Sequence, residues 1–572
     1  MAIELSSLTF TNQADVVPVS GVEQILNTGV ANTLAGDDSI TGTTTGSDPF
    51  AIFNSGTINT GAGHDIITGI RDENSIVPGA AIYNERGTIN TEDGNDIIIG
   101  SGQAGDGILI SLGTINTGDG NDKITGTAID SGINVNYEGI LDTGNGSDTI
   151  TGSGSSFGIQ NYFIINTGDG NDKITGNANF SGYGIVNVGT MDSGAGDDEI
   201  TGTNTGTNAN SVGIYNFSGN SIDTSNGNDK ITGTSTDTGI YNSGTINTGD
   251  GNDIITGTST SVGGGGIFSV AGIFNFGTNA IIDTGTGSDI ITATGSFGIY
   301  NEGTVNTGSG SDIITATGNG NGVGIYNTGN INTGDDNDTI TIANDIGGNG
   351  IYNSGTINTG DGNDIINSTG GLGDGGSIGI YNSEGTINTG TGRDIITGTS
   401  NDYGIFNTGT INTGDASDII TGTSTTEGGG GIYNDDIIDT GAGNDIITAT
   451  GTGYGIYNNG GAINTGNGND SIIANEGFQS APNSGGAWFL GEGEDYIKGY
   501  GSGDFYGGNG FDRLELTPGT YTLKKWVDNT GESVVFTKGN SLMITSEFEQ
   551  LIAGGTTYDF TSLTEGQIIT VA

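Results

Sequence analysis

A short repeated stretch does most to limit what this chain can fold into. It reads GIYNSGTINTGDGNDIITG at Gly239–Gly257, and variants of it fill most of the sequence. Each copy carries three spaced apolar positions, Ile240, Ile246 and Ile255 in this one, and a turn rich in Gly and Asp at Gly249–Asp253. One copy cannot bury its own apolar face, but stacked copies can. The repeat therefore predicts a solenoid with one continuous core.

The turn aspartates keep a fixed register with the apolar positions. The residue two places after each turn Asp is Ile, from Ile40 to Ile472. Spacings between successive turn aspartates vary from 23 residues (Asp289 to Asp312) to 36 (Asp253 to Asp289). The extra residues fall between the strand after Asp and the next Gly-Ile. Insertions at one corner indicate a coil with one loop-bearing edge.

Each copy predicts three short strands, with the sequences GIYN, GTINT and DIITGT. Ile and Thr favour strands, Gly punctuates them, and helix signals are nearly absent. We predict an all-β fold, a right-handed parallel β-solenoid of about 17 three-stranded coils around a triangular core. The predicted regions are an N-terminal cap (1–35), the repeat solenoid (36–475), RTX-type repeats as defined below (476–515), and a small β-rich C-terminal cap with a secretion signal (516–572).

Composition limits the partners. The formal net charge is −55, from 66 acidic against 11 basic residues, which disfavours nucleic acid and anionic lipid. A hydrophobic content of 31% with 115 Gly leans towards disorder, but the constant Ile register argues against it. Cys is absent, so we expect no disulfide framework. We expect no membrane-spanning run and no N-terminal signal peptide.

The turn Gly-x-Gly-x-Asp-x-Ile has the chemistry of a calcium site. Its glycines let backbone carbonyls turn inward, and its Asp supplies the hard oxygen that Ca²⁺ prefers. The alternative is a solvated turn without metal. We favour calcium, because carboxylates stacked one coil apart repel each other without a cation.

Residues 489–516 carry the fullest form of this turn, with Gly507–Leu514 matching GGxGxDxUx throughout. The chain thus resembles the RTX (repeats-in-toxin, hemolysin-type) calcium-binding repeats of type I-secreted bacterial proteins. The body departs from that pattern, since its first Gly is Thr or Ser and each coil has one such turn. A second row of calcium ions is therefore in doubt. The predicted metal ligands are Asp65, Asp96, Asp122, Asp148, Asp172, Asp198, Asp229, Asp253, Asp289, Asp312, Asp338, Asp364, Asp394, Asp418, Asp445, Asp470, Asp495, Asp504 and Asp512.

Other turn positions vary. Four turns lose a glycine, and we expect their sites to be weaker or empty; the replacing residues are Glu92, Ser225, Asp336 and Ala416. An Asn or Asp six residues before each turn Asp suggests an Asx turn at the neighbouring corner, or less readily a ligand. Examples are Asn59, Asp142, Asn247 and Asp283.

Two further residue series accompany the GIYN strand. An Asn recurs two residues after the Ile, as in Asn242, either stacked on itself from coil to coil or placed for a left-handed bend. The residue between Ile and Asn is aromatic in a continuous block. If it points outward, it forms an adhesive stripe, and otherwise it lies in the core or under loops. The block is Tyr215, Tyr241, Phe274, Tyr300, Tyr326, Tyr352, Tyr381, Phe406, Tyr433 and Tyr457.

Catalysis finds little support. The one His, His64, occupies the variable position of a turn, and no cluster of Tyr, His, Lys or Arg beside Asp is visible by spacing. Ice binding by a threonine row is also disfavoured, because the variable turn position changes from Ala62 to Asp119 to Thr286 to Ser309, so we expect no flat Thr row.

The C-terminal segment resembles the signal by which RTX proteins leave the cell through a type I channel. We therefore predict a secreted, extracellular, calcium-binding structural protein that self-associates into a fibre, surface layer or matrix and is not an enzyme. The alternative is a calcium-dependent adhesin that binds cell-surface glycans. A polysaccharide-modifying enzyme is less favoured.

Overall fold

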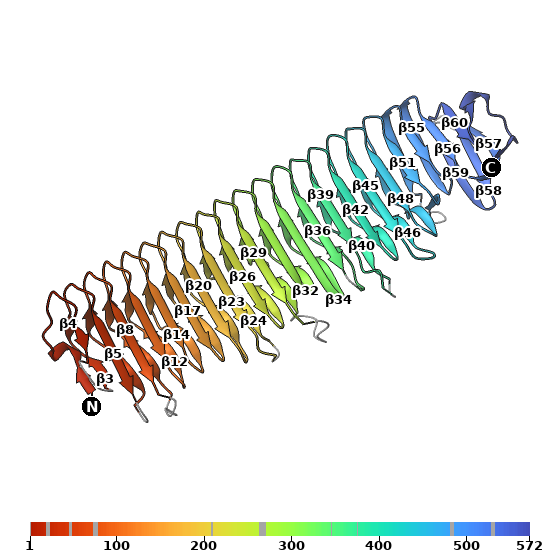
Figure 1. Ribbon diagram of the computed structural model, residues 1–572. Coiled ribbons are helices and arrows are strands. Elements are labelled where there is room, and N and C mark those ends of the chain that lie inside the picture. The colour runs from red at the N-terminus through yellow and green to blue at the C-terminus, as the bar shows by residue number, and fades with distance from the viewer. Residues whose placement is uncertain are drawn as a thin grey trace. The chain divides into compact units, whose positions relative to one another are not determined.

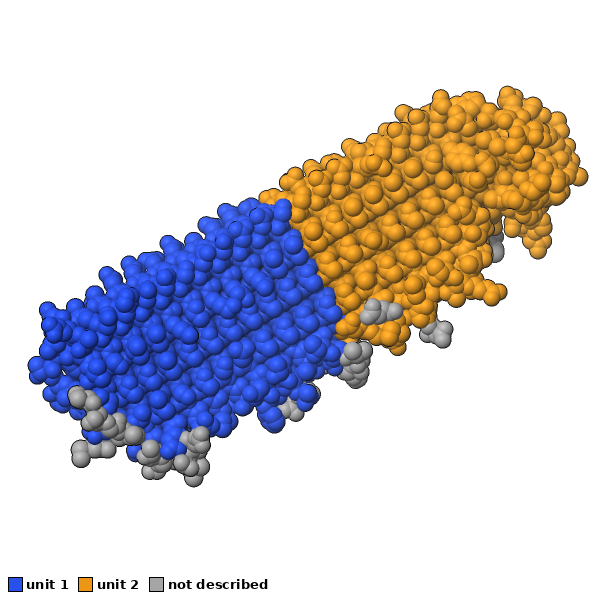
Figure 2. All heavy atoms as spheres, in the orientation of Figure 1, with its two compact units in different colours: residues 1–295, 303–305 blue, residues 296–302, 306–572 orange. Residues whose placement is uncertain are grey.

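The computed structural model describes residues 2–18, 23–44, 48–72, 78–207, 210–261, 270–344, 346–373, 376–480, 485–527 and 532–572. It forms two compact units, unit 1 (residues 1–295 and 303–305) and unit 2 (residues 296–302 and 306–572) (Figure 2). Within each unit the chain winds as a parallel β-solenoid of three-stranded coils, which confirms the predicted fold class (Figure 1). The described residues contain no α-helix, and two 3-10 turns occur at Leu5–Ser7 and Phe560–Ser562. No helix among them could span a membrane.

Three ladders of strands build each unit, named here by their repeat sequences GIYN, TIN and IITGT. In each ladder, a strand pairs in parallel with the equivalent strand of the next coil, as Ile124 with Ile150 and Ile159 with Ile185. β32 (Ile290–Asn301) and β33 (Thr304–Asn306) contain the division between the units.

The strands of unit 1 are as follows. The GIYN ladder holds β1 (Ala2–Glu4), β3 (Gln24–Asn27), β6 (Phe50–Asn54), β9 (Ala80–Glu85), β12 (Asp106–Ser111), β15 (Ser131–Asn136), β18 (Phe157–Asn161), β21 (Tyr183–Asn187), β24 (Val212–Asn216), β27 (Thr238–Asn242) and β30 (Ala271–Asn275). The TIN ladder holds β4 (Val30–Asn32), β7 (Thr57–Asn59), β10 (Thr88–Asn90), β13 (Thr114–Asn116), β16 (Ile140–Asp142), β19 (Ile164–Asn166), β22 (Thr190–Asp192), β25 (Ser221–Asp223), β28 (Thr245–Asn247) and β31 (Ile281–Asp283). The IITGT ladder holds β2 (Val16–Val17), β5 (Ser39–Thr44), β8 (Ile66–Arg71), β11 (Ile97–Ser101), β14 (Lys123–Thr127), β17 (Thr149–Gly154), β20 (Lys173–Ala178), β23 (Glu199–Asn204), β26 (Lys230–Ser235) and β29 (Ile254–Ser259).

In unit 2, β34 (Ile313–Asn327) begins in the IITGT ladder and ends in the GIYN ladder. The GIYN ladder continues with β37 (Ile351–Asn353), β40 (Ile378–Asn382), β43 (Tyr403–Asn407), β46 (Gly430–Asn434), β49 (Tyr454–Asn458) and β52 (Phe478–Ser480). The TIN ladder holds β35 (Asn330–Asn332), β38 (Thr356–Asn358), β41 (Thr386–Asn388), β44 (Thr410–Asn412), β47 (Ile437–Asp439), β50 (Ala462–Asn464), β53 (Ala487–Gly493) and β55 (Gly503–Gly510). The IITGT ladder continues with β36 (Thr339–Asn344), β39 (Ile365–Thr369), β42 (Ile395–Ser400), β45 (Ile419–Ser424), β48 (Ile446–Thr450), β51 (Ser471–Ala474), β54 (Tyr496–Lys498) and β56 (Arg513–Leu516).

The three apolar positions of each coil form the core. Ile159 on β18, Ile165 on β19 and Ile174 on β20 are fully buried, as are their equivalents in the other repeats. Side chains along β17 and β20 alternate between inward and outward, which gives the IITGT ladder a solvent-facing side. The constant Ile register of the sequence therefore corresponds to a continuous stack of buried Ile.

Glycines let the IITGT and GIYN strands of one coil pack closely. A Cβ on Gly152 of β17 would lie 2.2 Å from the carbonyl oxygen of Gly158 and 2.6 Å from Cγ1 of Ile159. The sequence analysis expected Gly to separate the strands. The Gly residues inside the strands have a second role, because they allow the two strands of a coil to lie close together. They bring two ladders nearly into backbone contact, so the core is narrower than a triangle of three equal sheets.

The two ends of the chain differ. β1 and β2 pair in parallel with β3 and β5, so the first residues already form part of the ladders. β53 to β56 extend the TIN and IITGT ladders through the RTX-like segment. After residue 516 the pairing becomes mostly antiparallel, among β57 (Gly519–Val527), β58 (Glu532–Lys538), β59 (Ser541–Ser546), β60 (Gln550–Ala553), β61 (Thr556–Asp559) and β62 (Ile568–Val571).

Candidate functional site: a buried row of aspartates

The Gly-Asp turn joins each TIN strand to the following IITGT strand, and its glycines are required by both conformation and space. In the turn before β29, Gly249 and Gly251 have φ values of 85° and 148°. A Cβ on Gly251 would lie 1.5 Å from the carbonyl oxygen of Gly227 one coil earlier. The glycines therefore let successive turns stack with backbone against backbone.

The turn aspartates form a row of hydrogen bonds from coil to coil. The backbone N–H of each donates to Oδ1 of the Asp in the next coil, as from Asp148 to Asp172 at 2.7 Å and from Asp445 to Asp470 at 2.8 Å. In unit 1 the row runs through Asp38, Asp65, Asp96, Asp122, Asp148, Asp172, Asp198, Asp229, Asp253 and Asp289. In unit 2 it runs through Asp312, Asp338, Asp364, Asp394, Asp418, Asp445, Asp470, Asp495 and Asp512. One oxygen of each carboxylate thus has a structural role that the sequence analysis did not foresee.

Both ends of the row are capped. At the N-terminal end, the N–H of Asp15 donates to Oδ1 of Asp38 at 2.7 Å. At the other end, the N–H of Asp512 donates to Oε2 of Glu549 at 2.7 Å. Glu549 belongs to the C-terminal segment, which therefore supplies the last acceptor of the row.

The second oxygen of these carboxylates is buried and receives no hydrogen bond. This holds for Oδ2 of Asp38, Asp65, Asp96, Asp122, Asp148, Asp172, Asp198, Asp229, Asp253, Asp338, Asp364, Asp394, Asp418, Asp445, Asp470, Asp495 and Asp512. A Thr hydroxyl five residues earlier lies near enough to lower the pKa of several of them, as Thr143 does for Asp148. However, the Thr143 hydroxyl donates its proton to the carbonyl of Thr167. Buried carboxylate oxygens without a donor are costly unless a cation or a proton compensates them.

Burial raises the pKa of the row. The pKa of Asp96, Asp148, Asp198, Asp253, Asp338, Asp418, Asp470 and Asp512 rises to about 7, chiefly through burial, with the neighbouring row carboxylates adding to the rise. Burial also raises the pKa of Asp172, Asp229, Asp364, Asp394 and Asp495 to about 6. In the absence of a cation, these groups are therefore only partly ionised at neutral pH.

The turns that lost a glycine keep a positive φ at the replaced position. Their replacing residues hold left-handed φ values: 63° for Glu92, 59° for Ser225, 84° for Asp336 and 97° for Ala416. The aspartates of these turns still take part in the row. The replacing residues therefore adopt a left-handed backbone conformation that is strained for a residue with a Cβ and unstrained for glycine.

Side chains alone do not complete a metal site. Among the described residues, no group of three or more His, Cys, Asp or Glu is arranged to hold a metal ion. Any ion bound along the row needs backbone carbonyls or water in addition to carboxylate oxygens. Of the predicted ligands, Asp504 stands apart, because it lies within β55 of the TIN ladder rather than in a turn of the row.

A second ladder runs along the exposed side of the same turns in the opposite sense. Here the side chain at the position before the row Asp accepts the N–H of its equivalent in the next coil. Asn228 accepts from Asn252 at 3.1 Å, and Nδ1 of His64 accepts from Asn95 at 2.9 Å. His64 is exposed, as expected from its variable position, and acts as one acceptor in this ladder.

The recurrent Asn of the GIYN strand forms a buried amide ladder. Nδ2 of Asn353 donates to Oδ1 of Asn382 and also to the carbonyl of Thr386. These residues are fully buried and do not adopt a positive φ, so stacking is the correct one of the two proposed roles. In unit 1 the ladder is interrupted where buried Ile110 and Val135 replace Asn.

The Asn or Asp that ends each TIN strand has two roles. The Asp members accept the N–H two residues later, as Asp142 does from Gly144 at 3.3 Å, which confirms the predicted Asx turn. They also accept the side-chain amide of the next coil, as Asp142 does from Asn166 at 2.9 Å. No described contact requires them as metal ligands.

The aromatic row lies on the outer side of the GIYN ladder and is mostly half-buried. Part of the row is stacked: Tyr300 and Tyr326 have ring centroids 4.9 Å apart at 12°, and Tyr326 and Tyr352 have centroids 4.8 Å apart at 6°. Other neighbours meet edge to face, as Tyr352 does with Tyr381 and Tyr381 with Phe406. In the stacked part, neighbouring rings cover the ring faces and leave little face for a sugar to stack on.

The variable turn position carries no threonine row, as expected, because Asp250 there stacks on Asn226 and Thr286. Threonine rows form elsewhere, on the solvent side of the IITGT ladder, where Thr397 pairs with Thr421 in register. Alternation along the strand places two Thr of every IITGT on the outer face.

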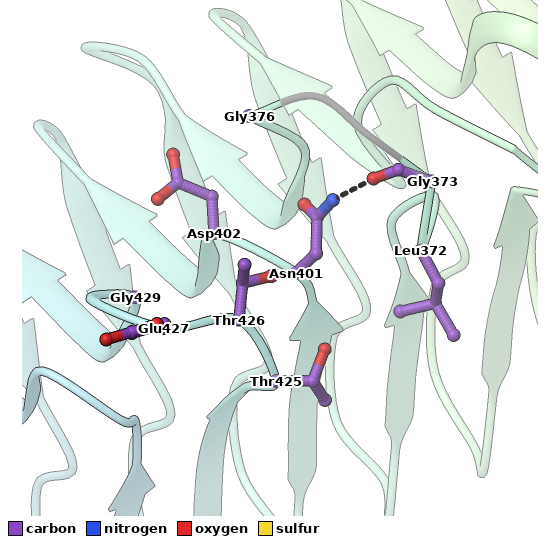
Figure 3. Close-up of a pocket in the computed structure, with 9 residues that line it drawn as sticks. All are labelled: Leu372, Gly373, Gly376, Asn401, Asp402, Thr425, Thr426, Glu427 and Gly429. Atoms are coloured by element: carbon purple, nitrogen blue, oxygen red, sulfur yellow. Dashed lines mark hydrogen bonds between the residues drawn. The ribbon is translucent and has the colours of Figure 1, made fainter.

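A hollow of about 810 Å³ opens in unit 2 among the loops that follow β39, β42 and β45 (Figure 3). The amide of Asn401 donates to the carbonyl of Gly373, and burial raises the pKa of Asp402. The acidic side chains of its lining are Asp402 and Glu427, and the others are Gly, Thr, Asn and Leu. This arrangement by itself indicates no particular reaction.

Comparison with known proteins adds little. No family model matches the sequence, and no curated protein matches it. A solved structure described as a hyperactive, Ca²⁺-dependent, beta-helical antifreeze protein from an Antarctic bacterium is similar at 16% identity and a TM-score of 0.30. The match covers 67% of this chain and 85% of that one. A similarity this low carries no argument about the function of this chain.

Proposed function

We propose that the chain is an extracellular structural protein whose β-solenoid is stabilised by calcium bound along the aspartate row. The observation that carries the proposal is the series of buried carboxylates that each keep one oxygen without a hydrogen bond. A cation shared between neighbouring coils would compensate these oxygens and offset the repulsion along the row.

Calcium fits the available donors better than other common cations. The row offers carboxylate oxygens and backbone carbonyls, which are hard ligands, and Ca²⁺ accepts irregular sets of such oxygens. Cys is absent from the chain and the one His is exposed, so soft or imidazole-rich coordination has no support. The Asp side chains of the row would hold the ion, and the turn carbonyls and water would complete its coordination.

Secretion would bring this acidic chain to a place where calcium is abundant. With a net charge of −55, the chain repels itself when few divalent cations are present, and it gains most from binding them where calcium is abundant. Sites that bind at about 10⁻⁴–10⁻³ M are typical of extracellular modules. Release through a type I channel, followed by folding on calcium outside the cell, is part of this proposal.

The test compares row aspartates with exposed aspartates of the same turns or of the next turn. The triple variant Asp122→Asn, Asp148→Asn and Asp172→Asn removes three row charges but keeps the Oδ1 acceptors. The matched control, Asp119→Asn, Asp169→Asn and Asp197→Asn, removes three exposed charges. Calcium bound per chain after equilibrium dialysis, and the calcium-induced rise in Tm, should both fall in the first variant and stay near wild type in the second.

Two results would contradict the calcium proposal. One is a wild-type chain that keeps its Tm and its β-sheet circular dichroism unchanged between chelator and calcium. The other is an equal loss of bound calcium in both triple variants, which would place the ions on the exposed turn surface rather than on the row.

A glycan-binding adhesin is the alternative. The half-buried aromatic row gives it some apolar surface, but rings stacked on one another offer mainly edges. Binding to glycan arrays by calcium-loaded protein, lost on Tyr326→Ala and Tyr352→Ala, would favour this alternative over the structural role.

A further inference from the structure

One face of unit 2 is free of charge in a strongly acidic chain. It consists of the outward-pointing residues of β34, β36, β39, β42, β45 and β48, and we call it the uncharged face. Its first column is Ile313, Thr339, Ile365, Ile395, Ile419 and Ile446. Its second column is Thr315, Thr341, Asn367, Thr397, Thr421 and Thr448. Its third column is Thr317, Ala343, Thr369, Thr399, Thr423 and Thr450.

The uncharged face is accessible and regular. All of its residues are exposed or half-buried, and Ile313 and Ile446 are 41% and 39% exposed. Strict register repeats each column from strand to strand at about 4.8 Å, and the columns lie about 7 Å apart. Figure 2 shows regular rows of atoms along the surface of unit 2.

Charge returns beyond this face. In unit 2, β54 and β56 carry Lys498, Arg513 and Glu515 on the same ladder, with Lys498 and Glu515 paired at 3.1 Å. In unit 1 the equivalent first column includes Lys123, Lys173 and Lys230, whereas β29 and β32 carry no outward charge. Charged side chains normally block contact between sheets, so their absence leaves this face able to meet another sheet.

We propose that the uncharged face of unit 2 binds the same face of a second copy of this chain. The proposal rests on the structural role proposed above and names the partner for it. Elsewhere the turns carry exposed acids, so two copies that meet there would set like charges against each other. The uncharged face avoids this repulsion, and its identical columns let side chains of two copies interdigitate as sheets do in dry zipper interfaces.

The size of the face predicts weak but specific association. Six strands with five residues each cover roughly 500 Å² per copy, or about 1,000 Å² for the pair, which is near the lower limit of specific interfaces. The pairing should therefore be reversible and depend on concentration. Such lateral contacts suit a matrix built from many copies, where several weak contacts add up.

The test introduces lysine into the first column, a strand position at which unit 1 already carries lysine. Ile395→Lys and Ile419→Lys place two charges in the first column of the uncharged face, and the pair Ile97→Lys and Thr149→Lys is the matched control in the first column of unit 1, on either side of Lys123. Lysine lowers the net negative charge, so general repulsion cannot explain weaker association. Sedimentation velocity in calcium over a range of concentrations should show self-association of wild type and control, and at least tenfold weaker association of the double variant.

A cysteine scan gives a second readout, because the natural chain contains no Cys. Thr421→Cys on the uncharged face should form an intermolecular disulfide under mild oxidation, whereas Thr151→Cys, in the same column of unit 1 beside Lys123 and Lys173, should remain largely monomeric. Equal crosslinking of the two variants would overturn the proposal.

Other outcomes separate the two proposals. A wild type that responds to calcium but stays monomeric at all concentrations overturns this inference and leaves the calcium proposal intact. A monomer that is incorporated into growing ice, with Thr421→Lys abolishing the incorporation, also overturns it and assigns the threonine columns to ice instead. Loss of the calcium response itself would show that the proposed function has failed.

Discussion

Each turn aspartate uses its two oxygens differently. Oδ1 is committed to the fold, because it accepts the N–H of the preceding coil's Asp, as Asp172 does for Asp148. Oδ2 is buried without a hydrogen-bond donor. Replacement by Asn keeps the first contact and removes the charge, so the two roles can be separated by one substitution.

The raised pKa values predict how the metal-free protein responds to pH. Burial raises the pKa of Asp96 and Asp148 to about 7, above the ordinary value of about 3.9. A raised pKa means that the folded state holds protons more tightly than the unfolded state. The stability that these protonated carboxyl groups contribute to the folded state is therefore fully present below about pH 4, and it is lost as pH rises through about 7. Metal-free protein should show a Tm that falls from pH 4 to pH 8.

Calcium should reverse that trend, because it binds the deprotonated carboxylates. With saturating calcium, we expect the Tm to rise or stay level over the same pH range. Thermal unfolding followed by circular dichroism in both conditions checks this. Parallel pH curves with and without calcium would show that the row is not the calcium site.

Ala416 holds a left-handed conformation that suits glycine. Its φ is 97°, which costs a residue with a Cβ about 1–2 kcal/mol. We expect Ala416→Gly to raise the free energy of unfolding by about 1 kcal/mol, after allowing for the greater freedom of Gly in the unfolded chain. The matched control is Ala442→Gly, which lies in the next turn without a positive φ and should be neutral or destabilising. Denaturant unfolding in calcium measures both, and an equal response of the two variants would argue against strain at Ala416.

At the level of the strands, the asparagine ladder shows how polar groups stay buried. Asn353 accepts from Asn327 and donates to Asn382. Removal of Asn353 leaves Oδ1 of Asn382 without its ladder donor, whereas the amide of Asn327 still donates to the carbonyls of Gly329 and Thr356. Unit 1 contains two adjacent apolar members, Ile110 and Val135, and the last Asn before them turns its amide to the carbonyls of Gly87 and Thr114. Adjacent gaps are therefore compatible with the fold.

This predicts strong coupling between neighbouring substitutions. Asn353→Val should cost about 2 kcal/mol, because Oδ1 of Asn382 and the carbonyl of Thr386 both lose a buried donor. The double variant Asn353→Val and Asn382→Val should cost about the same as either single one, since again only the Oδ1 of the next Asn loses its ladder donor. Local opening free energies from native-state hydrogen exchange check this. Simple additivity of the two substitutions would contradict the ladder.

The strand arrangement followed from the sequence because the Ile positions keep a constant register with the turn Asp. Other features depended on neighbours in space. The bond from Asp148 to Asp172 joins two coils, and nothing in a single repeat shows it. The threonine columns were missed because the turn was examined instead of the outer side of strands such as β45. Asp504 directly follows Gly501-Ser502-Gly503, so it is one residue out of register with the Gly-x-Gly-x-Asp turn, and it lies in a strand.

For the whole molecule, charge repulsion is a large force that opposes folding. The chain carries a net charge of −55, and its bases number 11. Repulsion of this size opposes compaction until counterions collect. Divalent ions bound at the turn carboxylates would neutralise part of the negative charge directly. Monovalent salt only screens the repulsion between the charges.

Salt and calcium should therefore act differently. In chelator, the Tm should rise steadily as NaCl increases, because screening lowers the repulsion. With calcium present, the same addition of NaCl should change the Tm much less. Comparison of NaCl and CaCl₂ at equal ionic strength isolates the specific effect. If the two salts are equally effective, charge screening alone explains the stability.

The opposed hydrogen-bond ladders of the turn have an evolutionary consequence. Most coils offer one side-chain acceptor to the coil before and another to the coil after, as Asp253 and Asn252 do. The coil with Arg393 at the second position is an exception, because a guanidinium has no acceptor. Gene segments that encode the other coils can be duplicated or lost by unequal recombination while the new junction keeps both kinds of hydrogen bond.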